Sequence, residues 1–280
     1  MSIAPTISGD VTRFTKVDAT SDPTFFIRFV DAANEMESVK ECKRKMFDLM
    51  NIQPGDHVLD LGCGTGDDAR EMAQQVGPNG WVIGLDNSDI MIAEARRRAE
   101  HTGLAVDFRL GDAHHLEFAT GTFEVCRAER LLMHVPEPHR VVAEMTRVLK
   151  PGGRVVIFDF DWDAIVIAHP NKELTREIVL TVSDSIRNGQ IGRWLPGLIR
   201  AAGLVNISVT PHTILPDLTF FKQIYGGTLK RAQETDKLAA EAVTTWWSQL
   251  EEVDQGGQYF AGFTGYVFSG YKEGRLIRGI

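Results

Sequence analysis

The sequence predicts an α/β protein built on a doubly wound, mostly parallel β-sheet. Short apolar runs alternate with segments whose apolar residues recur at helical spacing, which is typical of parallel strands joined by crossover helices. The first apolar run ends in three glycines spaced two apart, as expected at the ligand-binding edge of such a sheet. The 280 residues, 43% of them hydrophobic, are enough for one large domain or a domain with a cap.

Seven apolar runs are the predicted strands, and helical stripes lie between most of them. Ser88 and Gly103 mark the start and the end of one predicted helix, and Pro151-Gly152-Gly153 stops a later one. The predicted strands are residues 57–61, 81–85, 105–110, 123–127, 154–159, 204–210 and 258–271.

Two segments, 160–192 and 212–256, are longer than any connection between strands needs. Insertions at the ligand edge of such a sheet usually form a lid or a cap, so we expect both to be cap insertions. Asp22-Pro23 looks like the start of a helix. We therefore expect residues 1–50 to form an N-terminal helical lid and residues 51–280 to form the main domain.

Composition and charge narrow the possible partners. A net charge of −8 and a pI of about 5.5 argue against non-specific nucleic-acid binding, and the Arg96-Arg97-Arg98 run is interpreted as a solvated helix face. Three cysteines without a close pair predict neither a disulfide framework nor a zinc site. No apolar run approaches the ~18 residues of a membrane span, and the first residues do not resemble a signal peptide. We expect a soluble cytoplasmic protein without a metal.

The stretch HVLDLGCGTGD, residues 57–67, indicates what the ligand contains. Gly62, Gly64 and Gly66 allow a tight turn and let a ligand touch the backbone. Asp86 ends the second predicted strand, 20 residues beyond Gly66, and its carboxylate can accept hydrogen bonds from both hydroxyls of a ribose. The ligand is therefore expected to contain a ribose.

Two ribose-containing cofactors compete for this site. A dinucleotide requires G-x-G-x-x-G, whereas the third glycine here follows one residue earlier. Asp67 and Asp68 at the helix start would repel a pyrophosphate and favour a ligand with an ammonium or a sulfonium. These features favour S-adenosylmethionine (SAM), with a nicotinamide cofactor as the alternative.

Four motifs in order resemble those of class I SAM-dependent methyltransferases. They are DLGCGTG at 60–66, GLDNSDIMIAEAR at 84–96, GDAHHLEF at 111–118 and VLKPGGRVVIFD at 148–159. They are most similar to the small-molecule group that includes the ubiquinone and menaquinone C-methyltransferases, and the likeness covers about residues 45–210. The resemblance implies SAM as cofactor and a Rossmann-like, seven-stranded sheet whose last strand is antiparallel.

The resemblance also implies roles for individual residues. Asp60 would lie near the amino group of the cofactor, and the Arg127 backbone carbonyl would accept from the same group. Asp86 would bind the ribose hydroxyls. The remaining implied contacts are Gly62 and Gly64 with the methionine moiety and ribose, Met91 or Asn87 with the adenine ring, Asp112 with its N6 amine and the Ala113 N–H with its N1.

Catalytic candidates follow the fourth predicted strand, near the expected methyl acceptor. His134 could take a proton from the acceptor, or it could cap the helix that begins near Pro136-Glu137. Glu129 is a second candidate base on the same grounds. Other tempting side chains have plainer interpretations: Cys63 as packing, His114-His115 as a turn, Trp246 and Trp247 as cap core or substrate stacking, and Asp161 and Trp162 as possible substrate contacts.

The expected function is methyl transfer from SAM to a small, largely apolar molecule, such as a quinone, polyketide, terpenoid or aromatic metabolite. Apolar and aromatic residues in 212–256 favour such an acceptor. Two alternatives stay open at this point: a SAM-binding protein that does not transfer methyl, and a nicotinamide-dependent oxidoreductase.

Overall fold

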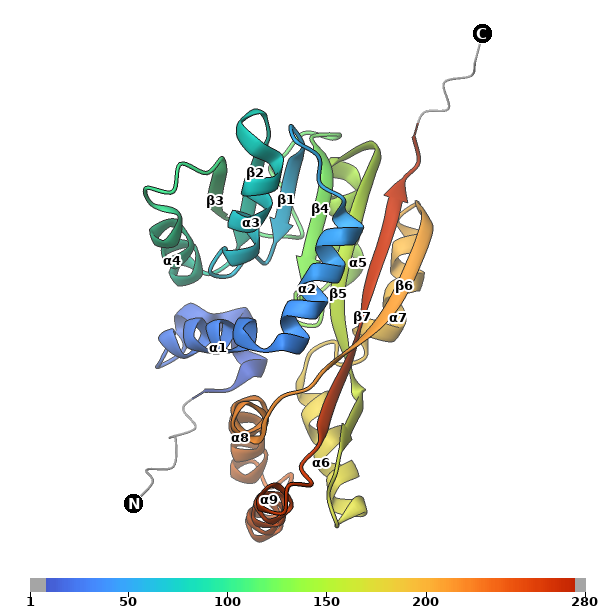
Figure 1. The fold of residues 1–280 in the computed structure, drawn as a ribbon. Helices are drawn as coiled ribbons and strands as arrows, with labels where there is room; N and C mark the ends of the chain where they lie inside the picture. Colours follow the sequence, from blue (N-terminus) through green and yellow to red (C-terminus); the bar gives the residue numbers. More distant parts are fainter. Residues whose placement is uncertain (1–8, 275–280) are drawn as a thin grey trace.

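Within residues 9–274, which the computed structural model describes, seven strands form one sheet (Figure 1). The strand order is β3-β2-β1-β4-β5-β7-β6, and β7 runs antiparallel to both of its neighbours. The other strands are parallel, so the predicted fold class and the antiparallel last strand are confirmed. The strands are β1 (His57–Leu61), β2 (Trp81–Asp86), β3 (Val106–Leu110), β4 (Phe123–Glu129), β5 (Leu149–Ile167), β6 (Leu204–Ile214) and β7 (Ala261–Lys272).

Helices cover both faces of this sheet, with α2 and α3 in front and α5 and α7 behind in the view of Figure 1. None of the helices within residues 9–274 is long and apolar enough to cross a lipid bilayer. The helical elements are η1 (Val11–Ala19), α1 (Thr24–Glu35), α2 (Glu37–Met50), α3 (Asp67–Val76), η2 (Gly77–Asn79), α4 (Asp89–Ala99), α5 (Pro138–Val148), α6 (Lys172–Ser185), α7 (Ile191–Ala201), α8 (Leu218–Glu234) and α9 (Ala240–Gln255).

The strand order places a switch point between β1 and β4. From β1 the chain continues outward to β2 and β3, and it then crosses back to β4 on the other side of β1. The loops that leave the carboxyl ends of β1 and β4 consequently diverge, and ligands of open α/β sheets bind in the resulting crevice.

Strand β5 is longer than predicted. It continues past the expected end at residue 159 and pairs its last residues with β7, as Ile165 with Phe263 and Ile167 with Ala261, after a register shift. The interpretation of 160–192 as an insertion is therefore wrong for residues 160–167, which belong to the sheet. This extended β5–β7 pair projects beyond β1 and β4 toward the cap helices (Figure 1).

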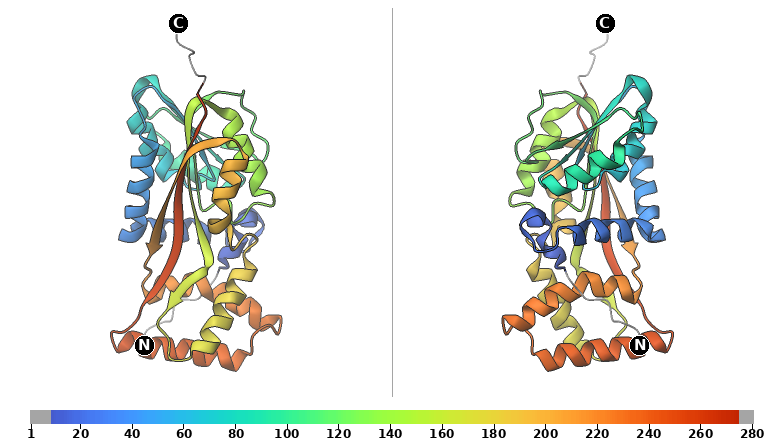
Figure 2. Two further views of the ribbon diagram at one scale, coloured as in Figure 1. Left: turned by 90° about the vertical axis from the view of Figure 1, so that its right-hand side faces the viewer. Right: turned by 90° about the vertical axis from the view of Figure 1, so that its left-hand side faces the viewer.

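Helices α6, α8 and α9 gather beyond the carboxyl ends of the parallel strands (Figure 2). Helix α8 contacts α6 and α9, and also η1 and α1 from the N-terminal segment. Trp246 of α9 is fully buried at the centre of this group: its ring lies 5.2 Å from that of His169, and its Nε1 donates to Thr175 Oγ1 at 3.0 Å. Trp246 is therefore a core residue of the cap rather than a stacking surface for a substrate.

Replacing Trp246 by alanine is expected to destabilise the protein by about 3–5 kcal/mol, because the cap loses its largest buried side chain and Thr175 loses a partner. Urea denaturation would measure this change. Trp194→Ala is the matched control, since that ring is 63% exposed and its loss should change stability by only about 0.5 kcal/mol. Equal effects of the two substitutions would contradict a core role for Trp246.

Candidate functional site

One pocket lies at the switch point, where the carboxyl ends of β1, β2, β4 and β5 meet η1, α1, α2 and α8. The structure brings together most of the side chains predicted from the sequence. Those that line the pocket are Gly62, Gly64, Asp86, Asn87, Met91, Arg127, Glu129 and His134. Asp60, Asp112 and Ala113 are not among the lining residues.

The glycines of the β1–α3 turn have two different roles. Gly64 has a φ of 52°, and a side chain there would meet nothing within 4 Å, so its backbone faces open space in the pocket. Gly66 has a φ of 74°, and an added Cβ would lie 2.5 Å from the Phe108 ring. Gly64 therefore leaves room for a ligand against the backbone, whereas Gly66 lets the helix pack against the sheet.

Asp86 lies across this turn, at the end of β2. Its carboxylate accepts from the Gly64 N–H and from the Ser88 N–H, both at 3.0 Å. Burial raises the pKa of Asp86, and these hydrogen bonds oppose the rise. Each oxygen keeps a further lone pair, so the carboxylate can still accept from two neighbouring hydroxyls.

A buried cluster of ions forms the floor of the pocket. The Arg127 guanidinium donates to Asp60 Oδ1 at 2.7 Å, to Asp68 Oδ2 at 2.6 Å and to Glu129. Lys43 of α2 adds a second cation, 2.8 Å from Asp68 Oδ1. The cluster thus joins β1, α3, β4 and α2 through charged side chains.

The pKa values within this cluster move in opposite directions. Burial raises the pKa of Asp60 to about 6, although Arg127 opposes the rise, and the second carboxylate oxygen has no partner within residues 9–274. Burial also disfavours the charged form of Asp68, but Arg127 and Lys43 outweigh it and lower the pKa of that carboxyl. Asp68 therefore stays ionised, and Asp60 titrates close to neutrality.

Arg127 lies two residues before the carboxyl end of β4, opposite Asp60 of β1. The sequence indicated only a role for its backbone carbonyl, which stays a prediction. The sequence did not reveal the ionic role of its side chain, because its partners are distant along the chain.

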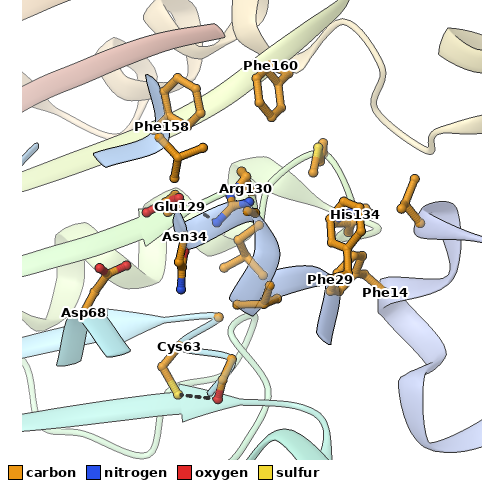
Figure 3. A pocket seen from close by; sticks show the side chains of 18 of the residues that line it. Phe14, Phe29, Asn34, Cys63, Asp68, Glu129, Arg130, His134, Phe158 and Phe160 are labelled. Atoms are coloured by element: carbon orange, nitrogen blue, oxygen red, sulfur yellow. Dashed lines mark hydrogen bonds and ion pairs between the residues drawn. The ribbon is translucent and has the colours of Figure 1, made fainter. Parts of the chain in front are cut away.

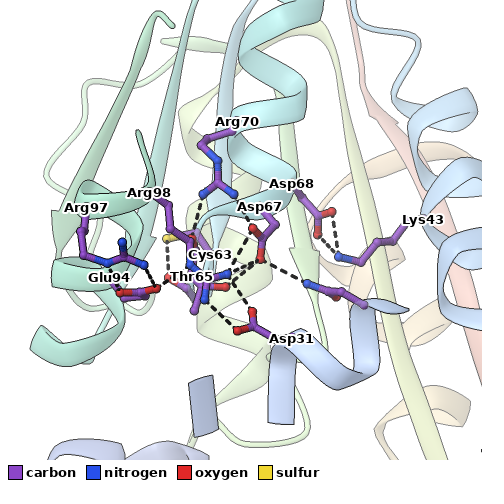
Figure 4. A network of polar contacts seen from close by, with 12 residues as sticks. Asp31, Lys43, Cys63, Thr65, Asp67, Asp68, Arg70, Glu94, Arg97 and Arg98 are labelled. Carbon is purple, nitrogen blue, oxygen red and sulfur yellow. Dashed lines mark hydrogen bonds and ion pairs between the residues drawn. The ribbon is translucent and has the colours of Figure 1, made fainter. Parts of the chain in front are cut away.

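Asp67 and Asp68, which were predicted to repel a pyrophosphate, are both paired with protein cations. Asp67 accepts from Arg70, from Thr65 Oγ1 at 2.8 Å and from Arg98 at 3.3 Å (Figure 4). Because protein cations neutralise both carboxylates, their charge does not by itself exclude a pyrophosphate. The choice of cofactor depends instead on the glycine spacing, Asp86 and the comparisons described below.

Ion pairs and hydrogen bonds hold the N-terminal segment, which comprises η1 and α1, against the cofactor side of the pocket. Arg98 of α4 forms a two-pronged ion pair with Asp31 of α1, with N–O distances of 2.7 and 2.8 Å (Figure 4). Asp18 of η1 accepts from Ser88 Oγ at 2.6 Å and from the Asp89 N–H at 2.9 Å, at the start of α4. The Asp18 contacts place η1 beside the turn that follows Asp86, and the Arg98 ion pair ties α1 to the last turn of α4.

Two of the predicted adenine contacts, Asp112 and Ala113, lie away from the lining, whereas Asn87 and Met91 belong to it. The side chain of Asp112 is 66% exposed and accepts from His114, at 2.9 Å from the backbone N–H and 2.6 Å from Nδ1. His114 is thus part of a turn, and no group of three or more His, Cys, Asp or Glu side chains that could hold a metal is found within the described residues. The cofactor roles of Asp112 and Ala113 stay predictions.

His134 faces the other half of the pocket, where aromatic side chains predominate (Figure 3). Its ring lies 5.6 Å from that of Phe14. It does not cap α5, because the first N–H groups of that helix receive no bond from its side chain, and Glu137 N–H instead lies 3.4 Å from His114 Nε2. The aromatic side chains around it are Phe14, Phe29, Phe158, Phe160, Trp162, Phe220 and Phe263.

Both predicted bases are weak in this environment. Burial, with the charge of Arg130, lowers the pKa of His134 to about 4. Burial opposes ionisation of Glu129, but the surrounding cations, Arg130 first, lower the pKa of that carboxyl. At neutral pH His134 is uncharged and Glu129 is an ion-paired carboxylate, so neither has a strong tendency to take a proton.

The loop after β4 is held by two residues that sequence reasoning missed. Asp159 is fully buried and accepts from the Leu132 N–H at 2.8 Å. Asn188 donates to the carbonyls of Leu132 and Val135 at 2.8 and 2.7 Å. Asp161, a predicted substrate contact, instead pairs with Arg193 and does not line the pocket, whereas its neighbour Trp162 does.

Comparison with known sequences gives a consistent picture. The family described as "Methyltransferase domain" matches residues 52–198. An uncharacterized 37.1 kDa protein in transposon TN4556 of Streptomyces fradiae is 38% identical over 245 residues, 86% of this chain and 70% of that protein. A demethylmenaquinone methyltransferase of Lactobacillus johnsonii is 38% identical over 119 residues, and the sterol 24-C-methyltransferase of Saccharomyces cerevisiae is 36% identical over 137 residues.

These matches cover 42% and 48% of this chain, and they span 49% and 35% of the lengths of the two named enzymes. Among solved structures, the YcgJ protein of Bacillus subtilis has a TM-score of 0.57 at 20% identity, covering 84% of this chain and 99% of that one. A phosphoethanolamine N-methyltransferase of Haemonchus contortus, solved with S-adenosylhomocysteine, has a TM-score of 0.54 at 20% identity, covering 83% and 52%. At these identities the likeness shows a shared fold.

Asp159→Asn is expected to stabilise the protein increasingly as the pH rises. Burial raises the pKa of Asp159 to about 7, so between about pH 4 and 7 the folded chain keeps a proton that the unfolded chain has lost. The free energy of unfolding of the unsubstituted protein therefore falls as the pH rises through this interval. Asparagine does not ionise, so the variant avoids this loss, and its amide oxygen can still accept from the Leu132 N–H.

Relative to the unsubstituted protein, the free energy of unfolding of the variant should rise by about 1–3 kcal/mol between pH 5 and pH 8. Urea denaturation at the two pH values would measure this difference. Asp107→Asn, on the exposed edge strand, is the control and should show little change with pH. A pH-independent effect of Asp159→Asn would exclude a buried, late-titrating carboxyl.

Proposed function

Because this chain belongs to the methyltransferase domain family and is a class I SAM-dependent methyltransferase, we propose that it moves the methyl group of SAM to a small, largely apolar molecule. The observation that carries this proposal is that one pocket joins a glycine turn open to a cofactor with a chamber of aromatic side chains. Methyl transfer requires such a joint site, because donor and acceptor must lie in line and in contact.

SAM is the cofactor of this family, and the residues at the switch point fit it. The open space beside Gly64 suits a ligand packed against the backbone, and the paired oxygens of Asp86 suit the two ribose hydroxyls. Asn87 and Met91, which also line the pocket, would flank the adenine. When bound, SAM supplies a methyl group that its sulfonium makes electrophilic.

The aromatic half of the pocket supports an apolar, ring-bearing acceptor. Phe14 and Phe29 reach it from the N-terminal segment, Phe158 and Phe160 from β5, and Phe220 from α8. Among the relatives, the names demethylmenaquinone methyltransferase and sterol 24-C-methyltransferase describe acceptors of this kind. The name of another relative, arsenite methyltransferase of Halobacterium salinarum, describes a different one.

Catalysis in this proposal depends on alignment and on exclusion of water. A sulfonium is already a good electrophile, so the chain has mainly to hold the acceptor in line and keep the site dry. His134 would act as a neutral hydrogen-bonding group toward the acceptor rather than as a strong base. Glu129 would act by orienting Arg127 and Arg130, with which it forms ion pairs.

The experiment that tests the proposal has two steps. Calorimetry should detect binding of S-adenosylhomocysteine and no comparable binding of NADH. SAM with a labelled methyl group should then label at least one compound in a panel of hydroxyquinones, phenols, sterols and polyketides. Cofactor binding without transfer to any acceptor would favour a SAM-binding protein that does not methylate, and preferential NADH binding would refute the proposal.

Asp86→Asn is expected to weaken binding of S-adenosylhomocysteine about 10- to 30-fold, or about 1.5–2 kcal/mol, because charge-assisted hydrogen bonds to the ribose become neutral ones. Calorimetry on the folded variant would measure the change. Asp107→Asn should bind normally, since that side chain lies on the exposed edge of the sheet. Unchanged affinity of Asp86→Asn would remove this residue from the cofactor site.

The N-terminal segment and the α8–α9 region should act as a lid that the cofactor tightens. We expect amide hydrogen exchange in residues 22–35 and 212–256 to be faster than in β1, and to slow when S-adenosylhomocysteine is added. Arg98→Ala, which removes the ion pair with Asp31, should speed exchange in α1 and leave α9 unchanged. Protection equal to that of β1 without ligand would identify these segments as a fixed part of the core.

A further inference from the structure

We propose that Arg130 forms a subsite for a negatively charged oxygen of the methyl acceptor, so that the acceptor is an acidic hydroxy compound, a phenol or an enol, that binds as its oxyanion. This inference deepens the proposed function and rests on it. It assigns a role to a residue that none of the sequence motifs singled out.

The backbone of Arg130 holds its side chain at the pocket. Arg130 directly follows β4 and has a φ of 54°, a left-handed conformation that side chains other than glycine rarely adopt. Its N–H donates to the Phe158 carbonyl at 2.8 Å. Leu132, two residues further on, is held because its N–H donates to Asp159 and its carbonyl accepts from Asn188. The surroundings therefore impose this conformation, and the guanidinium lies between Glu129 and His134 in Figure 3.

The charge of Arg130 is only partly used within the protein. Its one ion pair within residues 9–274 is with Glu129, at 2.8 Å, and Glu129 is also bound by Arg127. The side chain of Arg130 is 22% exposed and lines the pocket, whereas Arg127 is 2% exposed and has three carboxylate partners. A guanidinium has five N–H donors in a fixed fork, so Arg130 retains donors for an oxygen in the pocket.

The weakness of the two candidate bases leads to the same conclusion. A phenol has a pKa near 10, far above the value of about 4 for His134, so transfer of its proton to this ring would be unfavourable. A cation at hydrogen-bond distance from the hydroxyl oxygen lowers the pKa of the hydroxyl instead. No strong base is then required in the pocket.

The bond changes balance without a further reagent. The hydroxyl proton leaves to bulk water as the acceptor binds. An electron pair of the oxyanion, or of a ring carbon conjugated with it, forms the new bond to the methyl carbon. The methyl–sulfur bond breaks with its electron pair retained by sulfur, which becomes neutral. If carbon is methylated, the carbon that gained the methyl group then loses its proton to water, which re-forms the oxyanion.

The test uses 4-nitrophenol, whose oxyanion absorbs near 400 nm, with the protein saturated with S-adenosylhomocysteine. The absorbance of the bound probe, followed against pH, gives the pKa of its hydroxyl. We expect that pKa to fall by at least about one unit on binding, which corresponds to an oxyanion bound about tenfold more tightly than the neutral phenol. Arg130→Met should abolish the shift, and Arg130→Lys should restore part of it. Arg140→Met, which removes an exposed arginine from α5, should leave the shift intact.

A measurement on the unsubstituted protein makes the test independent of whether a variant folds. At pH 8, 4-nitrophenol should bind more tightly than its neutral methyl ether, 4-nitroanisole, and equal or tighter binding of the ether would overturn the proposal. If Arg130→Met loses affinity for S-adenosylhomocysteine but retains the shift, Arg130 binds the methionine carboxylate and the proposal is wrong. Failure of the unsubstituted protein to bind S-adenosylhomocysteine would refute the proposed function itself, whatever the probe shows.

Discussion

The burial of Arg127 is the constraint on which the rest of the site depends. A guanidinium that is 2% exposed must be fully matched by carboxylates, since one uncompensated buried charge costs about 3–5 kcal/mol. Asp60, Asp68 and Glu129 provide that match from β1, α3 and β4. The cluster thereby ties β1 and the helix that follows it to β4 on the other side of the switch point. The polar floor of the pocket is consequently fixed by the protein itself.

This cluster also explains why the pocket has two unlike halves. Its charges lie on the side of the glycine turn, and Lys43 extends them to α2. The opposite side is walled by aromatic residues of β5, α8 and the N-terminal segment, which provide dispersion and no fixed charge. Arg130 stands at the boundary, so a molecule that spans both halves would place its polar atom there and its apolar ring beyond.

A feature could be predicted from the sequence when the residues that define it lie close together along the chain. The strand 57–61, its glycine turn and Asp86 were predictable because the apolar run, the turn and the following strand lie close together in the chain. The ion cluster was not, since residues that pair directly within it, such as Asp60 and Arg127, are as many as 67 residues apart. The same limit applies to Asp68, whose cationic partners Lys43 and Arg127 are 25 and 59 residues away. The end of β5 was misplaced because its continuation is defined by pairing with β7.

The N-terminal segment links the two halves mechanically. Asp18 is anchored at the start of α4, next to the turn that follows Asp86, while Phe14 of the same short helix lies against His134 in the aromatic half. Phe29 and Asp31 repeat this arrangement on α1, one contacting Phe220 and the other Arg98. A displacement that opens the cofactor half must therefore also remove part of the wall of the aromatic half. Ligands in the two halves would then stabilise the same closed arrangement, which couples their binding without any change in the sheet.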